Sequence, residues 1–471
     1  MLNFSEFNGN KDFLPFFEEI SSIPRGSGNT EKIADYLVLF AKERGLFCKR
    51  DSYNNVIIKK SASQGFENAP AIILQGHTDM VIAYDEDATR DLTKEGVDLY
   101  IDGDFLKARG TTLGADNGIA VAYMLALLDS KDIHHPEIEA VFTSDEEIGL
   151  IGADKLDTSI LSGKTMINLD SDEESVFIAG CAGGTRIDIT RKCASVKANE
   201  YFKLTVSGLI GGHSGTEIDK NRINAIKLLS EIIPNGAMIG EIKGGNADNA
   251  IPRYAECKVV YDGNIEENVK NALIKYKGTE NNISITCEKE SGEAFFFTKE
   301  ESERLLNLIG ELPYGVIKMN DDIGLVETSM NVGTIESESD SVSIAVSLRS
   351  SITDEKDALA KKVIAIAEKL GYSTKRHGDY PGWAYKKDSV IREVLTASYK
   401  ELFGKTAQVV TIHAGLECGL FSDKIEGLDC ISMGPIAYDI HTPQERLSIS
   451  SAIRVYELLS KTLSNYKGET K

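Results

Sequence analysis

The chain has 471 residues, 42% of them hydrophobic and 27% charged, which is typical of a globular protein with two or three domains. Its formal net charge is −21, from 52 basic and 73 acidic residues. This balance argues against a nucleic-acid surface or an anionic membrane as partner. No apolar run approaches the roughly 20 residues of a membrane span.

The cysteines and the first residues indicate a compartment. The seven cysteines are scattered, odd in number and form no CxxC pair, which fits a reducing environment. The stretch 1–7 lacks a basic region followed by an apolar one, so no secretory signal is expected. We therefore expect a cytoplasmic protein.

Hydrophobic patterns in the first 185 residues predict an α/β structure. Amphipathic helices are expected at 11–22 and 30–44, with Gly45 at the C′ position of the second. The acidic stretch 85–104 has no periodicity and is expected to be an irregular surface excursion. Apolar runs predict strands at 55–58, 71–74, 138–143 and 166–169.

From about residue 186 the order of elements changes. A βαββαβ pattern runs from a strand at 201–207 to one at 283–288, and a second follows from 294–298 to 372–376. This is the element order of a ferredoxin-like motif. We expect an insert of two successive such units. The predicted domains are 1–185 and 383–471, the two parts of an α/β catalytic domain, and the α+β insert 186–382.

A histidine and an aspartate follow the apolar run 71–74. Active sites of open α/β sheets lie beyond the carboxyl ends of the strands, and residues i and i+2 of an extended chain point to the same side. His77 can therefore bind a metal ion while Asp79 holds its other ring nitrogen. The alternative is an ordinary polar pair.

Acidic residues recur beyond other predicted strands and loops. Asp116 follows a glycine-rich loop and is either a helix N-cap or a carboxylate that faces the site. Glu146 and Glu147 follow the strand 138–143 and are either the first turn of a helix or a metal ligand beside a base. Asp170 follows the strand 166–169. The recurrence of such groups favours the functional interpretation.

Five residues are candidate metal ligands. Two imidazoles and three carboxylates fit two divalent ions, zinc first, with manganese and cobalt as alternatives. Glu146 would remain free to accept a proton from the attacking water, and one carboxylate would bridge the ions. This arrangement suits hydrolysis of an amide. The ligands are His77, Asp116, Glu147, Asp170 and His441.

Motifs along nearly the whole chain resemble those of the di-zinc exopeptidases that include carboxypeptidase G, aminoacylase and the dipeptidases. The resemblance is closest to the bacterial aminoacyl-histidine dipeptidases, the cytosol non-specific dipeptidases. It implies a zinc-exopeptidase-type catalytic domain, with a mixed central sheet flanked by helices, and a lid formed by the insert. The motifs are Ile23-Pro-Arg-Gly-Ser, Gly76-His-Thr-Asp, Gly110-Thr-Thr-Leu-Gly-Ala-Asp-Asn-Gly, Thr143-Ser-Asp-Glu-Glu, Asn168-Leu-Asp, Gly211-Gly-His-Ser-Gly, Asn249-Ala-Ile-Pro, His413-Ala-Gly-Leu-Glu and His441-Thr-Pro.

The resemblance implies roles for the catalytic-domain residues. Asp116 would bridge both ions and would be joined to Asn117 by a cis peptide bond. His77 and Asp170 would complete one metal site, and Glu147 and His441 the other. Asp79 would orient His77, and Glu146 would act as general base and acid.

The resemblance also implies roles for the lid. His213 would stabilise the tetrahedral oxyanion, although a loop histidine is the alternative from sequence alone. Asn249 and Arg349 would hold the substrate, with Arg349 suited to a C-terminal carboxylate or, alternatively, an exposed strand arginine. Glu417 would bind the substrate amino group or support the site. A lid of two units could complete the site within one chain, so a monomer is geometrically possible beside a homodimer.

The expected activity is metal-dependent hydrolysis of unblocked dipeptides, Xaa-His among them, with no nucleic-acid or membrane partner. Within the same superfamily the alternatives are a tripeptide aminopeptidase, an N-acyl amino acid deacylase and a carboxypeptidase. From another class, the alternative is a metal-binding scaffold without catalytic activity.

Overall fold

The computed structural model describes residues 2–321 and 324–468, which form two compact units. Unit 1 contains the chain up to Gly180, Ala384–Thr411 and the chain from Leu416 onward. Unit 2 contains Cys181–Trp383 and the short segment Ile412–Gly415. The predicted insert, 186–382, lies within unit 2, and its independence as a folding domain stays a prediction.

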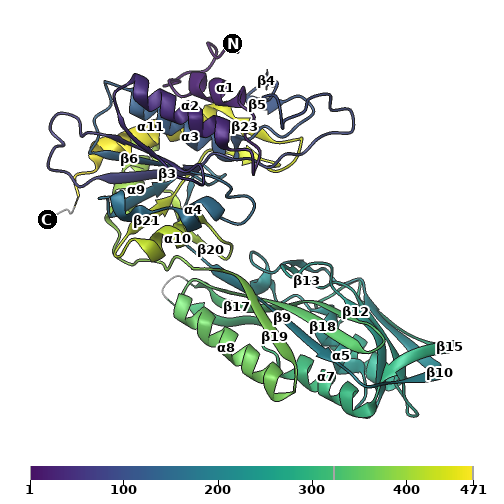
Figure 1. The fold of residues 1–471 in the computed structure, drawn as a ribbon. Helices are drawn as coiled ribbons and strands as arrows, with labels where there is room; N and C mark the ends of the chain where they lie inside the picture. The colour runs from purple at the N-terminus through teal and green to yellow at the C-terminus, as the bar shows by residue number, and fades with distance from the viewer. Residues whose placement is uncertain (1, 322–323, 469–471) are drawn as a thin grey trace. The chain divides into compact units, whose positions relative to one another are not determined.

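Unit 1 is built on a mixed sheet, which confirms the predicted fold class (Figure 1). Among the described residues the sheet has eight strands in the order β1-β2-β6-β3-β7-β21-β8-β20. The central strands β6, β3, β7 and β21 are parallel, whereas β1 pairs antiparallel with β2, β2 with β6, and β8 with β21. The strands are β1 (Phe47–Arg50), β2 (Val56–Lys60), β3 (Ile72–His77), β6 (Ile138–Thr143), β7 (Thr165–Asn168), β8 (Val176–Cys181), β20 (Gln408–Ile412) and β21 (Asp429–Ser432).

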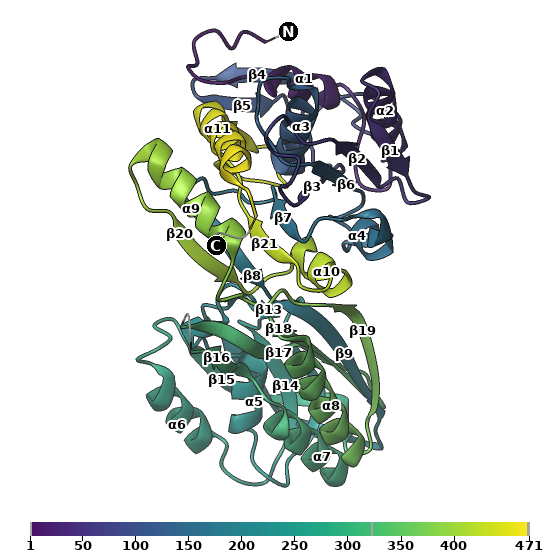
Figure 2. The same ribbon diagram turned by 90° about the vertical axis from the view of Figure 1, so that its left-hand side faces the viewer.

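Helices cover both faces of this sheet (Figures 1 and 2). Ile72 and Leu74 of β3 belong to a continuous apolar core with five of the helices, α1, α2, α3, α9 and α11. Helices α4 and α10 pack together on the other side. Gly45 follows α2 with φ of 66°, as the C′ prediction required. The helices are α1 (Leu14–Ser21), α2 (Glu31–Glu43), α3 (Ala115–Asp129), α4 (Ile151–Lys155), η1 (Thr158–Ile160), α9 (Val390–Phe403), α10 (Glu417–Lys424) and α11 (Ile449–Asn465).

The stretch 85–104 is more regular than predicted. It contains β4 (Leu99–Asp102), which pairs with β5 (Phe105–Ala108) in a small sheet of order β22-β23-β5-β4. The strands β22 (Ala437–Tyr438) and β23 (Arg446–Ser448) come from the far end of the chain. The prediction was wrong for these residues because the strands that complete their sheet, β22 and β23, are remote in sequence and leave no local periodicity.

Unit 2 is an α+β structure around one long sheet. Among its described residues the strand order is β15-β10-β14-β12-β17-β18-β9-β19, and β16 pairs with β17. Helices α5, α6, α7 and α8 pack on it in one apolar core. The elements are β9 (Gly183–Lys192), β10 (Ser195–Ser207), β11 (Gly212–His213), η2 (Ile218–Lys220), α5 (Ala225–Ile232), β12 (Met238–Gly244), β13 (Ala250–Ile251), β14 (Ala255–Val260), α6 (Glu266–Tyr276), β15 (Ser284–Phe297), α7 (Lys299–Glu311), β16 (Gly315–Asn320), β17 (Leu325–Ser337), β18 (Ser341–Ser350), α8 (Thr353–Lys369) and β19 (Ser373–Tyr380).

The two βαββαβ motifs of unit 2 are nested rather than successive. In the first, β10-α5-β12-β14-α6-β15, the strands lie in the spatial order fourth, first, third, second. The second motif has the mirrored spatial order: second, third, first, fourth. It does so only if β9 is its first strand, so that the motif reads β9-α7-β17-β18-α8-β19. The predicted strand 294–298 is the end of β15, which pairs with β10 over its whole length. The first motif is therefore inserted between β9 and α7 of the second.

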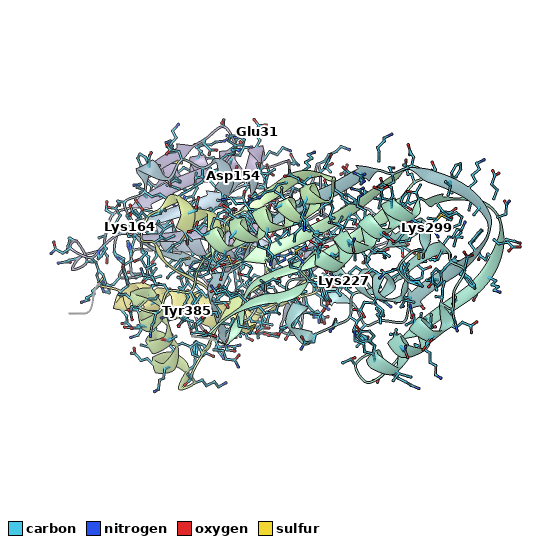
Figure 3. All side chains as sticks on the ribbon, turned by 90° about the horizontal axis from the view of Figure 1, so that it is seen from below. Glu31, Asp154, Lys164, Lys227, Lys299 and Tyr385 are labelled. Atoms are coloured by element: carbon cyan, nitrogen blue, oxygen red, sulfur yellow. The ribbon has the colours of Figure 1, made fainter. Side chains whose placement is uncertain are left out.

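The acidic composition appears as a charged surface. Figure 3 shows the side chains on the ribbon, and the labelled residues Glu31, Asp154, Lys164 and Lys299 are all exposed. Within the part of the chain that the structure describes, no helix combines the length and the apolar character needed to cross a bilayer.

Candidate metal centre

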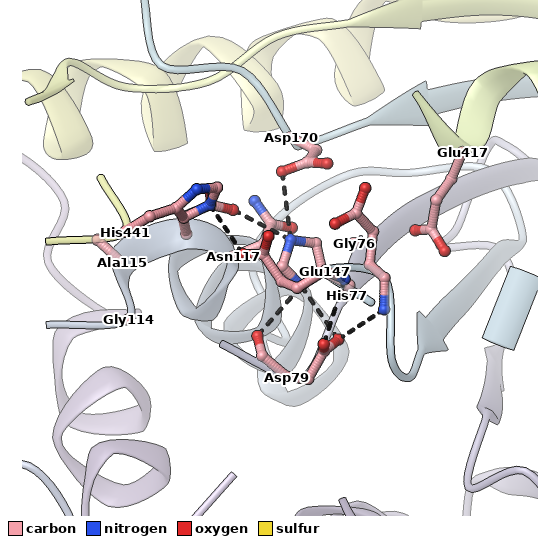
Figure 4. Close-up of polar contacts among 12 residues, drawn as sticks. Gly76, His77, Asp79, Gly114, Ala115, Asn117, Glu147, Asp170, Glu417 and His441 are labelled. Carbon is pink, nitrogen blue, oxygen red and sulfur yellow. Dashed lines mark hydrogen bonds and ion pairs between the residues drawn. The ribbon is translucent and has the colours of Figure 1, made fainter. Parts of the chain in front are cut away.

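Three strand ends bring the predicted site residues of unit 1 together. Strand β3 pairs in parallel with β6, with His77 opposite Thr143, and with β7, with Gln75 opposite Asn168. The segments that follow these strands carry the HxD pair, the two adjacent glutamates and Asp170. They therefore leave the sheet at the same edge, as Figure 4 shows.

The five predicted ligands form two clusters that share Asp116. In the first, Nε2 of His77 lies 3.0 Å from Oδ1 of Asp116 and 3.7 Å from Oδ1 of Asp170. In the second, Nε2 of His441 lies 3.1 Å from Oδ2 of Asp116 and 3.0 Å from Oε1 of Glu147. Asp116 thus presents one oxygen to each cluster, which is the geometry of a bridging ligand.

The two clusters fit divalent ions. With zinc–ligand distances of about 2.0–2.2 Å, two ligand atoms of one tetrahedral ion lie roughly 3–3.5 Å apart. In each cluster the three ligand atoms lie within 4.8 Å of one another. Oε1 of Glu147 is buried, and it faces Nε2 of His441 at 3.0 Å within its cluster. Imidazole nitrogens and carboxylate oxygens suit zinc, manganese or cobalt.

Asp79 orients both His77 and the glutamate loop. Nδ1 of His77 lies 3.1 Å from the backbone oxygen of Asp79 and 3.4 Å from its Oδ1, which leaves Nε2 for the cluster. The buried carboxylate of Asp79 also accepts bonds from Oγ of Ser27 at 2.8 Å and from the backbone N–H groups of Glu146 and Glu147 at 3.0 and 3.4 Å. Asp79 therefore holds both the ring of His77 and the backbone of the loop that carries Glu146 and Glu147, and its part in a carboxylate–histidine–metal arrangement stays a prediction.

Glu146 and Glu147 lie in a loop, which excludes the helix-start interpretation of this motif. Helix α4 begins at Ile151, so neither glutamate belongs to its first turn. Burial raises the pKa of Glu146 to about 8; His77 opposes this shift, and Glu417, Glu147 and Asp116 add to it. A carboxyl group with a pKa near neutrality is suited to accept and return a proton.

The charges of the two clusters depend strongly on one another. Burial lowers the pKa of His77, but Asp170, Asp116 and Asp79 together raise it well above its ordinary value. For His441, hydrogen bonding to Asp116 and Glu147 raises the pKa to about 10. The carboxylates thus hold positive charge at both imidazoles, a charge that divalent ions would supply when bound.

Asp116 is not a helix N-cap. Helix α3 is preceded by Gly114, and Asp116 and Asn117 have non-helical backbone angles. The peptide bond between them is cis, as the resemblance implied. The carboxylate of Asp116 faces the two histidines rather than the helix.

The predicted lid residues His213, Asn249 and Arg349 all belong to unit 2. Nδ1 of His213 accepts from the backbone N–H groups of Gly215 and Thr216, both at 3.2 Å, so the neutral ring carries its proton on Nε2. Burial lowers the pKa of His213, and the positive charge of Arg349 lowers it further. Nη1 of Arg349 donates to the hydroxyl of Tyr380 at 3.3 Å, and Asn249 lines a small cavity of about 20 Å³ with both.

Glu417 lies beside the centre as a fully buried carboxylate. Its Oε2 accepts from Nε2 of Gln75 at 2.5 Å and from Oγ1 of Thr143 at 2.7 Å. Burial raises its pKa to about 7. Oε1 has no hydrogen-bond partner in the described part of the chain. These contacts fix Glu417 against β3 and β6 at the edge of the site (Figure 4).

Sequence reasoning assigned no role to Arg25 and Glu445, two buried charged residues that hold the loop before Asp116. Arg25 stands within a quoted motif, and Glu445 follows His441 by four residues. Their proximity to known motifs was the only available signal.

Comparisons with known proteins identify the family of the chain. A family model described as peptidase family M20/M25/M40 matches residues 73–465. The cytosol non-specific dipeptidase of Escherichia coli (strain K12) is 36% identical over 467 residues, 95% of this chain and 96% of the relative. The crystal structure of aminoacylhistidine dipeptidase from Vibrio alginolyticus has 34% identity and a TM-score of 0.93, covering 98% of this chain and 97% of its own. A tripeptidase from Staphylococcus aureus, with 17% identity and a TM-score of 0.60, shares the fold.

The fold and the paired ligand clusters define a metal-dependent peptidase. More particularly, the chain belongs to peptidase family M20/M25/M40. The predicted resemblance and the predicted enzyme class are confirmed.

Proposed function

We propose that this protein is a dipeptidase that holds two divalent metal ions and hydrolyses unblocked dipeptides, Xaa-His among them. The observation that carries the proposal is the pair of clusters joined through Asp116, with Glu146 beside them. The dipeptidase names of the Escherichia coli and Vibrio alginolyticus relatives support the substrate class. The cytosol named for the Escherichia coli relative supports a cytoplasmic location.

The residues of the centre have distinct tasks in this proposal. His77, Asp116 and Asp170 hold one ion, and Asp116, Glu147 and His441 hold the other. When bound, such ions make a water molecule nucleophilic at neutral pH and polarise the attacked carbonyl. Glu146 accepts the proton of the attacking water and returns it to the leaving amine.

Unit 2 supplies the substrate contacts and acts as the lid. Nε2–H of His213 is free to donate to the oxyanion because Nδ1 is occupied by backbone N–H groups. Arg349 has a buried Nε that donates to no described residue, so its guanidinium retains capacity for a carboxylate. Asn249 assists in holding the substrate, and Glu417 binds its amino group or supports the site. Together these four residues hold both ends of a dipeptide, and they can do so in a monomer or a homodimer.

Reconstitution with metal should restore activity on free dipeptides only. We expect chelator-treated protein to be inactive, and protein with two equivalents of zinc, manganese or cobalt to cleave dipeptides, with N-acetylated dipeptides and a tripeptide uncleaved. The measurement is ninhydrin detection of released amino acids over this panel. Cleavage of acetylated or longer substrates would instead favour the deacylase, carboxypeptidase or tripeptidase alternatives. Two bound ions without any cleavage would favour a scaffold.

Arg349→Lys should raise KM more than it lowers kcat. A hydrogen bond to a charged group contributes about 1.5–3 kcal/mol, so losing the bidentate contact should raise KM about 10- to 100-fold. A dipeptide amide lacks the carboxylate and should be cleaved equally slowly by wild type and variant. The control is Arg191→Lys on β9, where the arginine is paired with Glu301. An equal loss on the amide would contradict carboxylate recognition.

A further inference from the structure

The carboxylate of Glu445 is enclosed by backbone N–H groups of the loop that carries Asp116. Its Oε2 accepts from the N–H groups of Leu113 and Gly114 at 2.8 and 2.9 Å. Its Oε1 accepts from those of Ala115 and Asp116 at 2.8 and 3.3 Å. Glu445 is 2% exposed, so these donors have little access to water. One side chain thus fixes four consecutive peptide groups.

Arg25 holds the opposite side of the same loop. Its Nη2 donates to the backbone oxygen of Gly114, whose N–H donates to Glu445. Its Nη1 donates to the backbone oxygen of Thr78 at 3.1 Å and approaches that of Asp79 at 3.4 Å. The backbone of Gly114 is therefore held on both sides, its oxygen by the buried cation of Arg25 and its N–H by the buried anion of Glu445. A Cβ on Gly114 would lie 2.6 Å from Nη2 of Arg25, which leaves space only for glycine.

These contacts connect the segments that carry the ligands. Arg25 joins the HxD segment, with His77, to the loop before Asp116. Glu445 joins that loop to the segment of His441, four residues earlier in the chain. In Figure 4, Gly114 and Ala115 lie on the same side of the cluster as His441. His441 itself is partly exposed, and its ring contacts only Asp116 and Glu147 among the ion pairs of the described chain. Its position therefore depends on how its own segment is anchored.

We propose that Glu445 is a positioning residue that fixes His441 relative to Asp116, and so controls binding of the ion held by Asp116, Glu147 and His441. This inference rests on the two-ion centre of the proposed function. The ion held by His77, Asp116 and Asp170 depends on it less, because His77 is the last residue of strand β3 and Asp170 follows strand β7.

The four hydrogen bonds to Glu445 require a carboxylate, and a carboxamide of the same shape cannot replace it. Each oxygen of Glu445 accepts two N–H bonds, so a carboxamide would place an NH₂ donor against two N–H donors. The loop or the segment of Glu445 must then move. Orienting partners of metal ligands typically contribute 10- to 100-fold to metal affinity. A role limited to the start of helix α3 would instead reduce the free energy of unfolding and leave the two affinities in their normal ratio.

The test is metal titration of apo-protein, with Glu139→Gln as matched control. Glu139 is a fully buried carboxylate of β6 that accepts from the N–H groups of Ser162 and Gly163, both at 2.9 Å, at the end of the strand away from Thr143. Zinc affinities come from isothermal titration. Cobalt absorption spectra report the ligand geometry of each site.

For Glu445→Gln we expect the ion of the His77 cluster to bind within about threefold of wild type. The ion of the His441 cluster should bind 10- to 100-fold more weakly, and the spectrum of cobalt in that cluster should be altered. Glu139→Gln should bind both ions as wild type does. If Glu445→Gln does not fold, Glu445→Asp decides, because its retracted carboxylate cannot reach all four N–H groups and should weaken the second ion in the same way. If the folded variant bound both ions with wild-type affinity, the role of Glu445 would be overturned, but the proposed two-ion centre would not. Fewer than two ions in the wild type would overturn the proposed centre as well.

Discussion

Glu146→Gln is expected to lower kcat about 100- to 10,000-fold, the range that a positioned general base contributes. The amide cannot accept the proton of the attacking water. Glu146 belongs to neither of the two three-residue ligand sets that share Asp116, but its carboxylate also lies close enough to His77 and Glu147 to form a third possible set. Because the proposed function assigns Glu146 to proton transfer, we expect the metal content to remain at the wild-type value. The measurements are kcat on a dipeptide and metal content by mass spectrometry of the same preparation.

Glu147→Gln is the matched control, because it changes the next residue of the same loop. Oε1 of Glu147 lies 3.0 Å from Nε2 of His441, so this variant should lose the ion of that cluster together with activity. The two variants therefore separate proton transfer from metal binding. Loss of metal in Glu146→Gln would show that its carboxylate is a ligand.

The site in unit 1 was predictable because its residues follow strand ends. Parallel strands place their carboxyl ends at one edge, so the HxD pair, Glu147 and Asp170 had to meet once strands β3, β6 and β7 were recognised. The sequence alone left the role of Asp116 open between N-cap and ligand. The structure excludes the N-cap because the residue leaves helical geometry, and its two oxygens point to different histidines, while its role as a ligand stays a prediction.

Features that depend on contacts between distant segments were not predictable. β4 and β5 were missed because their sheet is completed by β22 and β23, more than 300 residues later. The nesting of the motifs in unit 2 was missed because β9, the first strand of the second motif, was not recognised. Apart from its place four residues after His441, Glu445 carries no local signal, since its partners are backbone groups at 113–116, over 320 residues earlier in the chain.

Asp116→Asn should have the largest effect on the metal centre. The carboxylate presents Oδ1 to His77 and Oδ2 to His441, and an asparagine keeps only one oxygen as a ligand atom. One ion should therefore be lost and the other bound more weakly. Because a metal ion supplies several kcal/mol of charge stabilisation, and each 1.36 kcal/mol is a factor of ten in rate, activity should fall about 1,000-fold or more.

Asp170→Asn is the comparison that isolates the bridging role. Asp170 lies 3.7 Å from Nε2 of His77 and belongs to the cluster of His77 and Asp116 but not to that of His441, so this substitution should weaken one ion and leave the affinity of the His441 cluster near that of wild type. Zinc titration of both apo-variants distinguishes the cases. Two affinities reduced in Asp116→Asn and one in Asp170→Asn would establish Asp116 as the shared ligand. A single affected ion in both variants would mean that the clusters bind metal independently, and that the bridge between the two histidines is not used.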